Sequence, residues 1–221
     1  MDGRPTKHGG RVPRPLVAPQ RREQILSGLF RAIARKGFGA CSVSDIARES
    51  GLPRGILHYY FRSKEEMLEA LMRSLAEAHL AALDAFRARF DDPLRRVQAV
   101  LTFHLAPRDE RSRDIARVWI EYWGYGLQEE RVREVVRQVQ AGLRRRLRAD
   151  ILLLLRRRGS TAESAEAMAA LVLSLVEGPL LQRLYDDRAI PSRALLAEAH
   201  RFIEQALAPQ SGRAARKGRA R

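Results

Sequence analysis

The sequence has almost no cysteine: Cys41 is its single thiol, so no disulfide can form within the chain. A protein without disulfides fits a reducing compartment. The longest nearly apolar stretch covers residues 167–176, well short of the roughly 18–20 residues that a membrane-spanning helix needs. The first residues carry charges and prolines but lack the apolar segment of a secretory signal. The sequence therefore predicts a cytoplasmic protein that does not enter a membrane.

Signatures of common enzyme classes are missing as well. There is no His-Glu-x-x-His zinc motif, no Gly-x-x-x-x-Gly-Lys-Ser/Thr phosphate loop and no complete Gly-x-Gly-x-x-Gly. The five histidines are scattered without the spacing of metal ligands. Two of them, His79 and His104, are expected to be satisfied groups of a core or a pocket. We therefore expect no catalytic residue, no metal and no cofactor.

Positive charge is what the sequence has in excess. The 41 lysines and arginines outnumber the 26 aspartates and glutamates, and the net charge of +15 favours a polyanionic partner such as nucleic acid. Part of this charge lies in residues 1–18, a predicted flexible basic arm, and in residues 209–221, a predicted disordered basic tail. The runs Arg144–Arg146 and Arg156–Arg158 are expected to coat a solvated face.

The pattern of apolar residues predicts an all-α fold. From residue 20 onward these residues recur with helical periodicity, and no convincing strand alternation is present. A first helix ends at Gly37, and two short helices follow it. Ser63 and Glu66 then form a capping box for a long helix that reaches about Phe90. Further helices are predicted at about 93–106, 111–126, 128–158, 162–186 and 192–207.

The segment Ser42–Phe61 carries the strongest signal, that of a helix-turn-helix. Its two short helices are separated by Gly51, which adopts a positive φ without steric cost. Four apolar residues should hold the second helix across the first: Ile46, Leu52, Leu57 and Tyr60. The other face of the second helix remains uncovered, and a major groove accepts a helix of that width. The alternative is a hairpin of an ordinary core, which would not normally surround so short a helix with basic and aromatic side chains.

Several short motifs resemble the N-terminal domain of the TetR family: Ile46-Ala47, Gly51-Leu52, Arg54-Gly55 and His58-Tyr59-Tyr60-Phe61-Arg62-Ser63-Lys64. Both tryptophans and the Glu177-Gly178 region are similar to the BetI-like subgroup, whose members are choline-responsive repressors. The resemblance implies an N-terminal three-helix DNA-binding domain at residues 19–79. A long helix would join it to a helical ligand-binding and dimerisation domain at residues 80–208.

The resemblance also implies which residues contact DNA. One group should face base edges: Ser44, Arg54, Gly55 and His58. A second group should hold phosphates: Ser42, Tyr59, Tyr60 and Lys64. Pro53 stands where the family commonly has a serine N-cap, so the cap bond is missing or the helix starts at Pro53. Ile56 replaces a common threonine and offers an apolar surface to a thymine methyl. For Arg54, a bidentate contact to guanine and a phosphate contact remain alternatives.

An aromatic patch marks a candidate effector site in the second half of the chain. Trp119 and Trp123 are four residues apart and share one face of a helix, with Tyr122 beside them. Such a group can receive a quaternary ammonium through cation–π contact, helped by a nearby carboxylate. Glu177 is the preferred carboxylate, because Glu121 is expected to point elsewhere. The alternative is a plain aromatic core or part of a dimer surface.

The last two predicted helices are expected to form a homodimer interface, with a monomer as the alternative. Residues 165–176 are apolar nearly all round, as in a helix buried against its own subunit and a partner. The final helix has a seam of Leu195, Ala199, Phe202 and Ala206.

By resemblance, the chain is a ligand-responsive repressor that leaves a pseudo-palindromic operator in double-stranded DNA when a small-molecule effector binds. Two other functions stay open: a basic architectural nucleic-acid-binding protein without effector control, and an all-helical enzyme for an anionic substrate.

Overall fold

The computed structural model describes residues 18–106, 110–156, 161–186, 188 and 190–207, and within these residues it contains helices and no strand. The all-α prediction is confirmed. The basic arm, apart from Ala18, and the basic tail lie outside the described residues. The helices are, in chain order, α1 (Ala18–Lys36), α2 (Val43–Ser50), α3 (Arg54–Tyr60), α4 (Lys64–Arg87), α5 (Pro93–Leu105), α6 (Glu110–Gly126), α7 (Glu130–Arg156), α8 (Ala162–Tyr185) and α9 (Ser192–Leu207).

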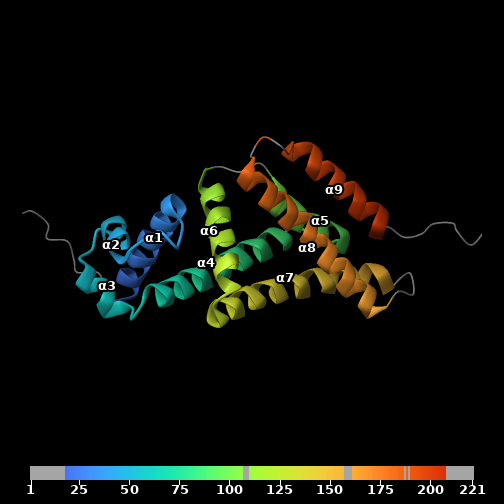
Figure 1. Cartoon of the computed structure of the whole chain (residues 1–221). Coiled ribbons are helices and arrows are strands. Elements are labelled where there is room, and N and C mark those ends of the chain that lie inside the picture. The colour runs from blue at the N-terminus through green and yellow to red at the C-terminus, as the bar shows by residue number, and fades with distance from the viewer. Residues whose placement is uncertain (1–17, 107–109, 157–160, 187, 189, 208–221) are drawn as a thin grey trace, which may run out of the picture.

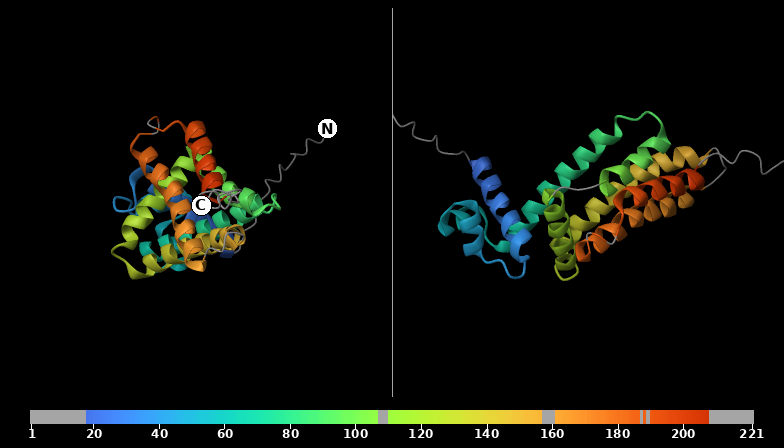
Figure 2. Two further views of the ribbon diagram at one scale, coloured as in Figure 1. Left: turned by 90° about the vertical axis from the view of Figure 1, so that its right-hand side faces the viewer. Right: turned by 90° about the horizontal axis from the view of Figure 1, so that it is seen from above.

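The molecule is elongated, with α1, α2 and α3 grouped at one end and a larger helical bundle at the other (Figure 1). Figure 2 shows α4 running from the first group into the bundle of α5, α7, α8 and α9. The helix α6 packs against α1 as well as against α7 and α8. It therefore lies where the two parts of the molecule meet.

Local sequence signals set the ends of the short helices. Asp45 N donates to Ser42 Oγ at 3.1 Å and Ser42 N donates to Asp45 Oδ2 at 2.9 Å, a reciprocal capping box that starts α2. Gly51 ends α2 with a φ of 68°, a left-handed value that costs glycine little. Pro53 is the N-cap of α3 and makes no side-chain hydrogen bond. Of the two alternatives for Pro53, the missing cap bond is therefore the one observed.

Close packing holds the three N-terminal helices together. A Cβ added to Gly28 of α1 would lie 2.6 Å from the Cβ and N of Ser50, so α1 and α2 touch backbone to backbone at this point. Leu57 of α3 and Ile46 of α2 are fully buried, and Phe61, directly after α3, is 1% exposed. Of the four apolar residues predicted to hold the helix-turn-helix together, Ile46 and Leu57 are thus buried, and Leu52 and Tyr60 are partly buried against the same core.

Ion pairs fix the second half of α4 to α7. Arg87 Nη2 donates to Asp150 Oδ2 at 2.6 Å, and Arg96 of α5 donates to the other oxygen of the same carboxylate at 2.7 Å. Arg146 makes two hydrogen bonds to Asp84, at 2.7 and 2.6 Å. The prediction that the arginine run around Arg146 only coats a solvated face is therefore wrong for Arg146, which faces α4.

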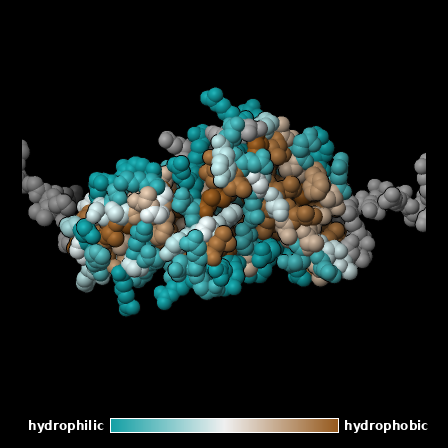
Figure 3. Space-filling model, viewed as in Figure 1, coloured by the Kyte–Doolittle hydropathy of each residue, from teal (hydrophilic) through white to brown (hydrophobic). Residues whose placement is uncertain are grey.

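Two helices, α8 and α9, combine a buried face with an open apolar face. On α9 the buried seam consists of Ala199, Ile203 and Leu207, whereas Phe202 is 48% exposed. Of the predicted seam, Ala199 is therefore buried within the chain, whereas Phe202 lies on the open face. Leu171 and Leu181 of α8 are 52% and 46% exposed. Apolar residues gather over the half of the molecule that holds these helices, as Figure 3 shows.

By length and composition α8 would also qualify as a membrane-spanning helix, which the short apolar run in the sequence did not suggest. A core helix of a soluble protein passes the same test, and one such helix among the described residues is weak support for a membrane. The buried residues of α8 pack in the same core as those of α7, which accounts for their apolar character.

Candidate functional site

The helix α3 presents one face to the core and leaves the other uncovered. Leu57 is buried, whereas Arg54 and His58 are exposed and Tyr59 is 82% exposed. Tyr60 is half-buried on the flank of the helix. The other positions expected to meet DNA bases are exposed too: Ser44, Gly55 and Ile56. The face of α3 that would enter a DNA groove is therefore accessible in this chain.

Two of the expected phosphate contacts already have partners within the protein. Ser42 Oγ donates to Asp45 Oδ2 at 2.7 Å as part of the capping box. Lys64 Nζ donates to the carbonyl oxygens of Phe38 and Cys41 at 2.9 and 3.0 Å, and lies 4.2 Å from the centre of the Phe38 ring. Lys64 therefore ties the start of α4 to the loop after α1. Its phosphate contact stays a prediction.

The carboxylate of Asp45 is the electrostatic centre of the motif. Lys36 Nζ and Arg48 Nη2 each lie 2.7 Å from its Oδ1. The hydrogen bond from Lys36, followed by those from Ser42 and Arg48, holds the pKa of Asp45 well below its usual range. Because Asp45 is ionised at neutral pH, the cap at the start of α2 persists there.

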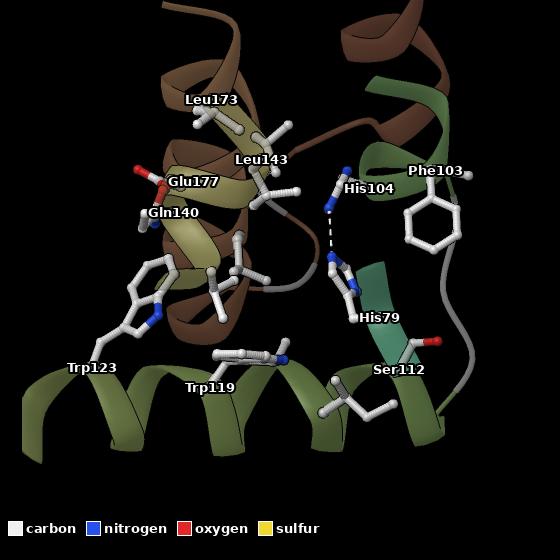
Figure 4. Close-up of a pocket in the computed structure, with 16 residues that line it drawn as sticks. His79, Phe103, His104, Ser112, Trp119, Trp123, Gln140, Leu143, Leu173 and Glu177 are labelled. Carbon is white, nitrogen blue, oxygen red and sulfur yellow. Dashed lines mark hydrogen bonds between the residues drawn. The ribbon is translucent and has the colours of Figure 1, made fainter. Parts of the chain in front are cut away.

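A cavity of about 360 Å³ opens in the C-terminal half, among helices α4 to α8. Trp119 and Trp123 rise into it from α6, and Gln140 of α7 and Glu177 of α8 lie together on another side (Figure 4). Gln140 Nε2 donates to Glu177 Oε1 at 2.6 Å. The rest of the wall is mostly apolar and includes Phe103, Ile115, Ala116, Val139, Leu143, Leu173, Val176 and Leu180. The structure thus brings three predicted effector residues to one cavity.

The fourth predicted effector residue, Tyr122, does not line this cavity. Its side chain is 1% exposed, and its ring packs edge-on against Trp119 with centroids 6.3 Å apart. Burial, with a smaller contribution from the Glu69 charge, raises the pKa of the Tyr122 phenol above its ordinary range. The spacing along the helix placed Tyr122 beside the tryptophans. The rotation of the helix between residues 119 and 122, however, directs the side chain of Tyr122 into the core.

A pair of histidines forms a second polar part of the cavity wall. His79 Nε2 lies 3.0 Å from His104 Nε2, and His104 Nδ1 lies 2.7 Å from the carbonyl oxygen of Val100. Both imidazoles are therefore satisfied pocket groups, as predicted. Their pairing was missed, although each lies on the apolar face of its helix. No cluster of three metal-ligating side chains occurs among the described residues.

The opposite side of α6 contacts the end of α1. Arg117 Nη1 donates to the carbonyl oxygen of Ala34 at 3.0 Å, and the backbone N of Phe38 donates to Glu121 Oε2 at 3.3 Å. The ring of Tyr125 packs on that of Phe38 at 4.9 Å. Glu121 thus points away from the tryptophans, as expected. One helix, α6, therefore carries both a part of the cavity wall and contacts to the N-terminal helices.

Comparison with known proteins agrees with this arrangement. Residues 25–71 match the bacterial regulatory proteins of the tetR family, and residues 93–208, slightly more than half of the chain, match the C-terminal part of BetI-type transcriptional repressors. The HTH-type transcriptional regulator BetI of Pseudomonas paraeruginosa is 28% identical over 203 residues, which cover 91% of this chain and 100% of that protein.

Solved structures show the same fold. A transcriptional regulator from Rhodococcus sp. Rha1 superposes with a TM-score of 0.73 at 26% identity, over 84% of this chain and 96% of that one. A transcriptional regulator from Saccharomonospora viridis, in complex with choline, has a TM-score of 0.75 at 22% identity, over 84% and 96% of the two chains.

Proposed function

Because the chain belongs to the TetR family of bacterial regulators and carries the C-terminal region of a BetI-type transcriptional repressor, we propose that it represses transcription as a cytoplasmic homodimer that an effector releases from DNA. The families that match are regulators and not enzymes. The observation that carries the proposal is the double role of α6, which lines the cavity with Trp119 and contacts the N-terminal helices through Glu121.

In this proposal the exposed face of α3 reads the operator in the major groove. Arg54 stands at the first turn of α3 and is exposed, so its guanidinium can reach the O6 and N7 atoms of a guanine. Substitution Arg54→Ala should then cost about 1–3 kcal/mol at one base pair of the operator and little at other positions. Binding to a set of single-base operator variants measures this difference. A loss that is equal for every sequence would instead assign Arg54 to a phosphate.

The effector that we propose for the cavity is a small organic cation. Trp119 and Trp123 offer aromatic faces, and Glu177 supplies a carboxylate in the same wall. A cavity of about 360 Å³ lies within the range of small-molecule sites. The choline bound to the regulator from Saccharomonospora viridis supports this class of ligand.

Dimerisation is proposed through the open apolar faces of α8 and α9. Leu171, Leu181 and Phe202 are each about half exposed, and such large apolar side chains gain by being covered in an interface. Two copies joined by these helices would form a four-helix bundle and carry two copies of α3 for two half-sites. Substitution Phe202→Glu should give a monomer in sedimentation and abolish binding to a palindromic operator. An unchanged mass would exclude this interface.

One experiment tests the whole proposal. Bound sequences are selected from a random DNA pool by the full chain, first alone and then with choline. We expect a palindromic motif that is recovered without choline and depleted with it. Selection without any motif would favour an architectural nucleic-acid binder. A motif that no small cation affects would contradict the effector assignment.

A further inference from the structure

The helix α3 has few features of its own that hold it in place. It spans seven residues, and a helix of that length is marginal in water without packing. Its N-cap, Pro53, makes no side-chain hydrogen bond, and Leu57 is its one buried residue. The direction in which its exposed face points therefore depends on contacts that neighbouring helices make with its ends.

One such contact comes from Arg22, near the start of α1. Its Nη1 donates to the carbonyl oxygen of Tyr60, the last residue of α3, at 3.0 Å. Its guanidinium carbon lies 4.2 Å from the centre of the ring of Phe61, which is 1% exposed. A positive charge is favourable on the face of an aromatic ring and at a helix C-terminus, where the last carbonyl groups lack partners within the helix. Arg22 therefore binds the end of α3 in two ways.

The same helix also holds the end of α2. Gln24 Nε2 donates to the carbonyl oxygen of Ser50, the last residue of α2, at 2.7 Å. Two nearby positions on α1, 22 and 24, thus bind the C-terminal carbonyl groups of both helices of the helix-turn-helix. The angle between α2 and α3 is therefore set by these two side chains together with the turn at Gly51.

We propose that Arg22 is a positioning residue for operator reading, which holds the C-terminal end of α3 against α1 and so fixes how Arg54 and His58 meet the bases. Arg22 contacts no base in this role and acts through α3. The inference rests on the proposed function, in which the exposed face of α3 reads the operator.

A phosphate contact by Arg22, whose side chain is exposed, is the competing role, and the two roles change different quantities. Loss of a phosphate contact weakens binding about equally for every DNA sequence, and lowers the slope of log affinity against log salt by about one. Loss of a positioning contact weakens binding to the operator more than binding to other DNA, and leaves this slope unchanged. It also loosens α3 in the free protein.

Arg22→Met tests the proposal, because methionine keeps an unbranched side chain and removes the charge and the donors. We expect affinity for the operator identified by selection to fall at least about tenfold, and affinity for unrelated DNA to fall less than about threefold. The salt slope of operator binding should stay within about 0.3 of the parent value. Arg89→Met is the matched control, because Arg89 also stacks on a phenylalanine, Phe86, but lies beyond the C-terminal end of α4.

A double-mutant cycle shows whether Arg22 acts through α3. In a background of Arg54→Ala, Arg22→Met should reduce operator affinity less than about threefold, because a misplaced α3 has then already lost its main base contact. If Arg22 instead bound a phosphate independently of α3, the two losses would multiply, and the proposal would be excluded.

Hydrogen exchange of the free protein measures the same contact without DNA. In Arg22→Met the backbone amides of residues 57–61 should exchange at least about fivefold faster, while the amides of α4 keep the parent rate. Choline binding, followed by tryptophan fluorescence, should stay unchanged and shows that the variant is folded. An equal acceleration in α1, α2, α3 and α4 would mean that Arg22 only stabilises the domain, and would exclude a positioning role.

The remaining outcomes have separate meanings. If the parent protein selects a motif, and Arg22→Met binds the operator and unrelated DNA with equal losses or with no loss, the positioning role is excluded and the proposed function stands. If the parent protein selects no motif, the proposed function fails, and the inference fails with it.

Discussion

Tyr122 buries a hydroxyl group that has no hydrogen-bond partner among the described residues. A buried polar group without a hydrogen-bond partner lowers the free energy of unfolding, because it loses its hydrogen bonds to water and gains none in the folded protein. The ring itself fills the space beside Trp119 and contributes to the core. The aromatic ring, and not the hydroxyl, is therefore what this position requires.

Substitution Tyr122→Phe should leave the free energy of unfolding unchanged or raise it by up to about 1 kcal/mol, because it removes only the unsatisfied hydroxyl. Urea denaturation measures the change, with the 88% exposed Tyr185→Phe as control. Effector binding should stay within about twofold of the parent, since Tyr122 is outside the cavity lining. A loss of stability above about 1 kcal/mol would mean that the hydroxyl has a partner in solution.

Among the helices, the contact between α1 and α2 depends on the absence of a side chain. Gly28→Ala would place a Cβ 2.6 Å from backbone and Cβ atoms of Ser50, so α2 must move away. We expect a loss of about 1–3 kcal/mol in unfolding free energy, together with weaker operator binding. Thermal denaturation and DNA titration measure both effects.

Gly124→Ala is the matched control for this substitution. Gly124 lies within α6 with no other atom group within 4 Å of an added Cβ, so alanine should stabilise that helix by about 0.5–1 kcal/mol. If Gly28→Ala behaved like Gly124→Ala, α1 and α2 would not be in close contact in solution.

The contact between α4 and α7 should depend on pH through Asp84. The hydrogen bond from Arg146, followed by weaker effects of Arg87, lowers the pKa of Asp84 in the folded chain. A carboxyl group with a lowered folded pKa stabilises the fold above its unfolded pKa, and this stabilisation is lost as the pH falls through the folded pKa. Asp84→Asn should therefore lower the urea midpoint at pH 7 and have a smaller effect at pH 3. An equal effect at both values would exclude an ionic contribution.

For the whole molecule, α6 offers a route from the cavity to the N-terminal helices that include α3. Its tryptophans line the cavity, and Arg117 and Glu121 on its other side hold the backbone of Ala34 and Phe38 at the end of α1. The far half of α4 is fixed to α7 by Asp84 and its partners. A ligand that displaces α6 would therefore move the N-terminal helices relative to the bundle.

The double substitution Arg117→Met with Glu121→Met should reduce coupling without removing either binding site. Choline reduces operator affinity by some factor in the parent protein, and we expect this factor to be about fivefold smaller in the double variant. A fivefold change corresponds to ~1 kcal/mol of coupling free energy, the size expected for the lost hydrogen bonds. Choline affinity, followed by tryptophan fluorescence, should change less than about twofold. Glu130→Met, at a position whose side chain is 63% exposed at the start of α7, is the control. Unchanged coupling in the double variant would exclude this route.

Local signals in the sequence are sufficient for the helices and the helix-turn-helix. The periodicity of apolar residues, the capping pair of Ser42 and Asp45, and the left-handed Gly51 act within a few residues of each other, so they can be recognised in the chain alone. Trp119 and Trp123 could likewise be placed on one face by their spacing. These features depend on residues that are close together in the chain, so they can be predicted from the sequence alone.

Contacts between distant helices were decided only by the tertiary structure. The pairing of His79 with His104, the turn of Lys64 toward Phe38 and Cys41, and the exposure of Phe202 depend on how helices cross, which no spacing along one helix reveals. The sequence by itself determined an all-helical regulator with a DNA-reading helix. The relative packing of α4 to α8 determined which polar groups meet inside the cavity, because side chains from separate helices converge only after those helices pack.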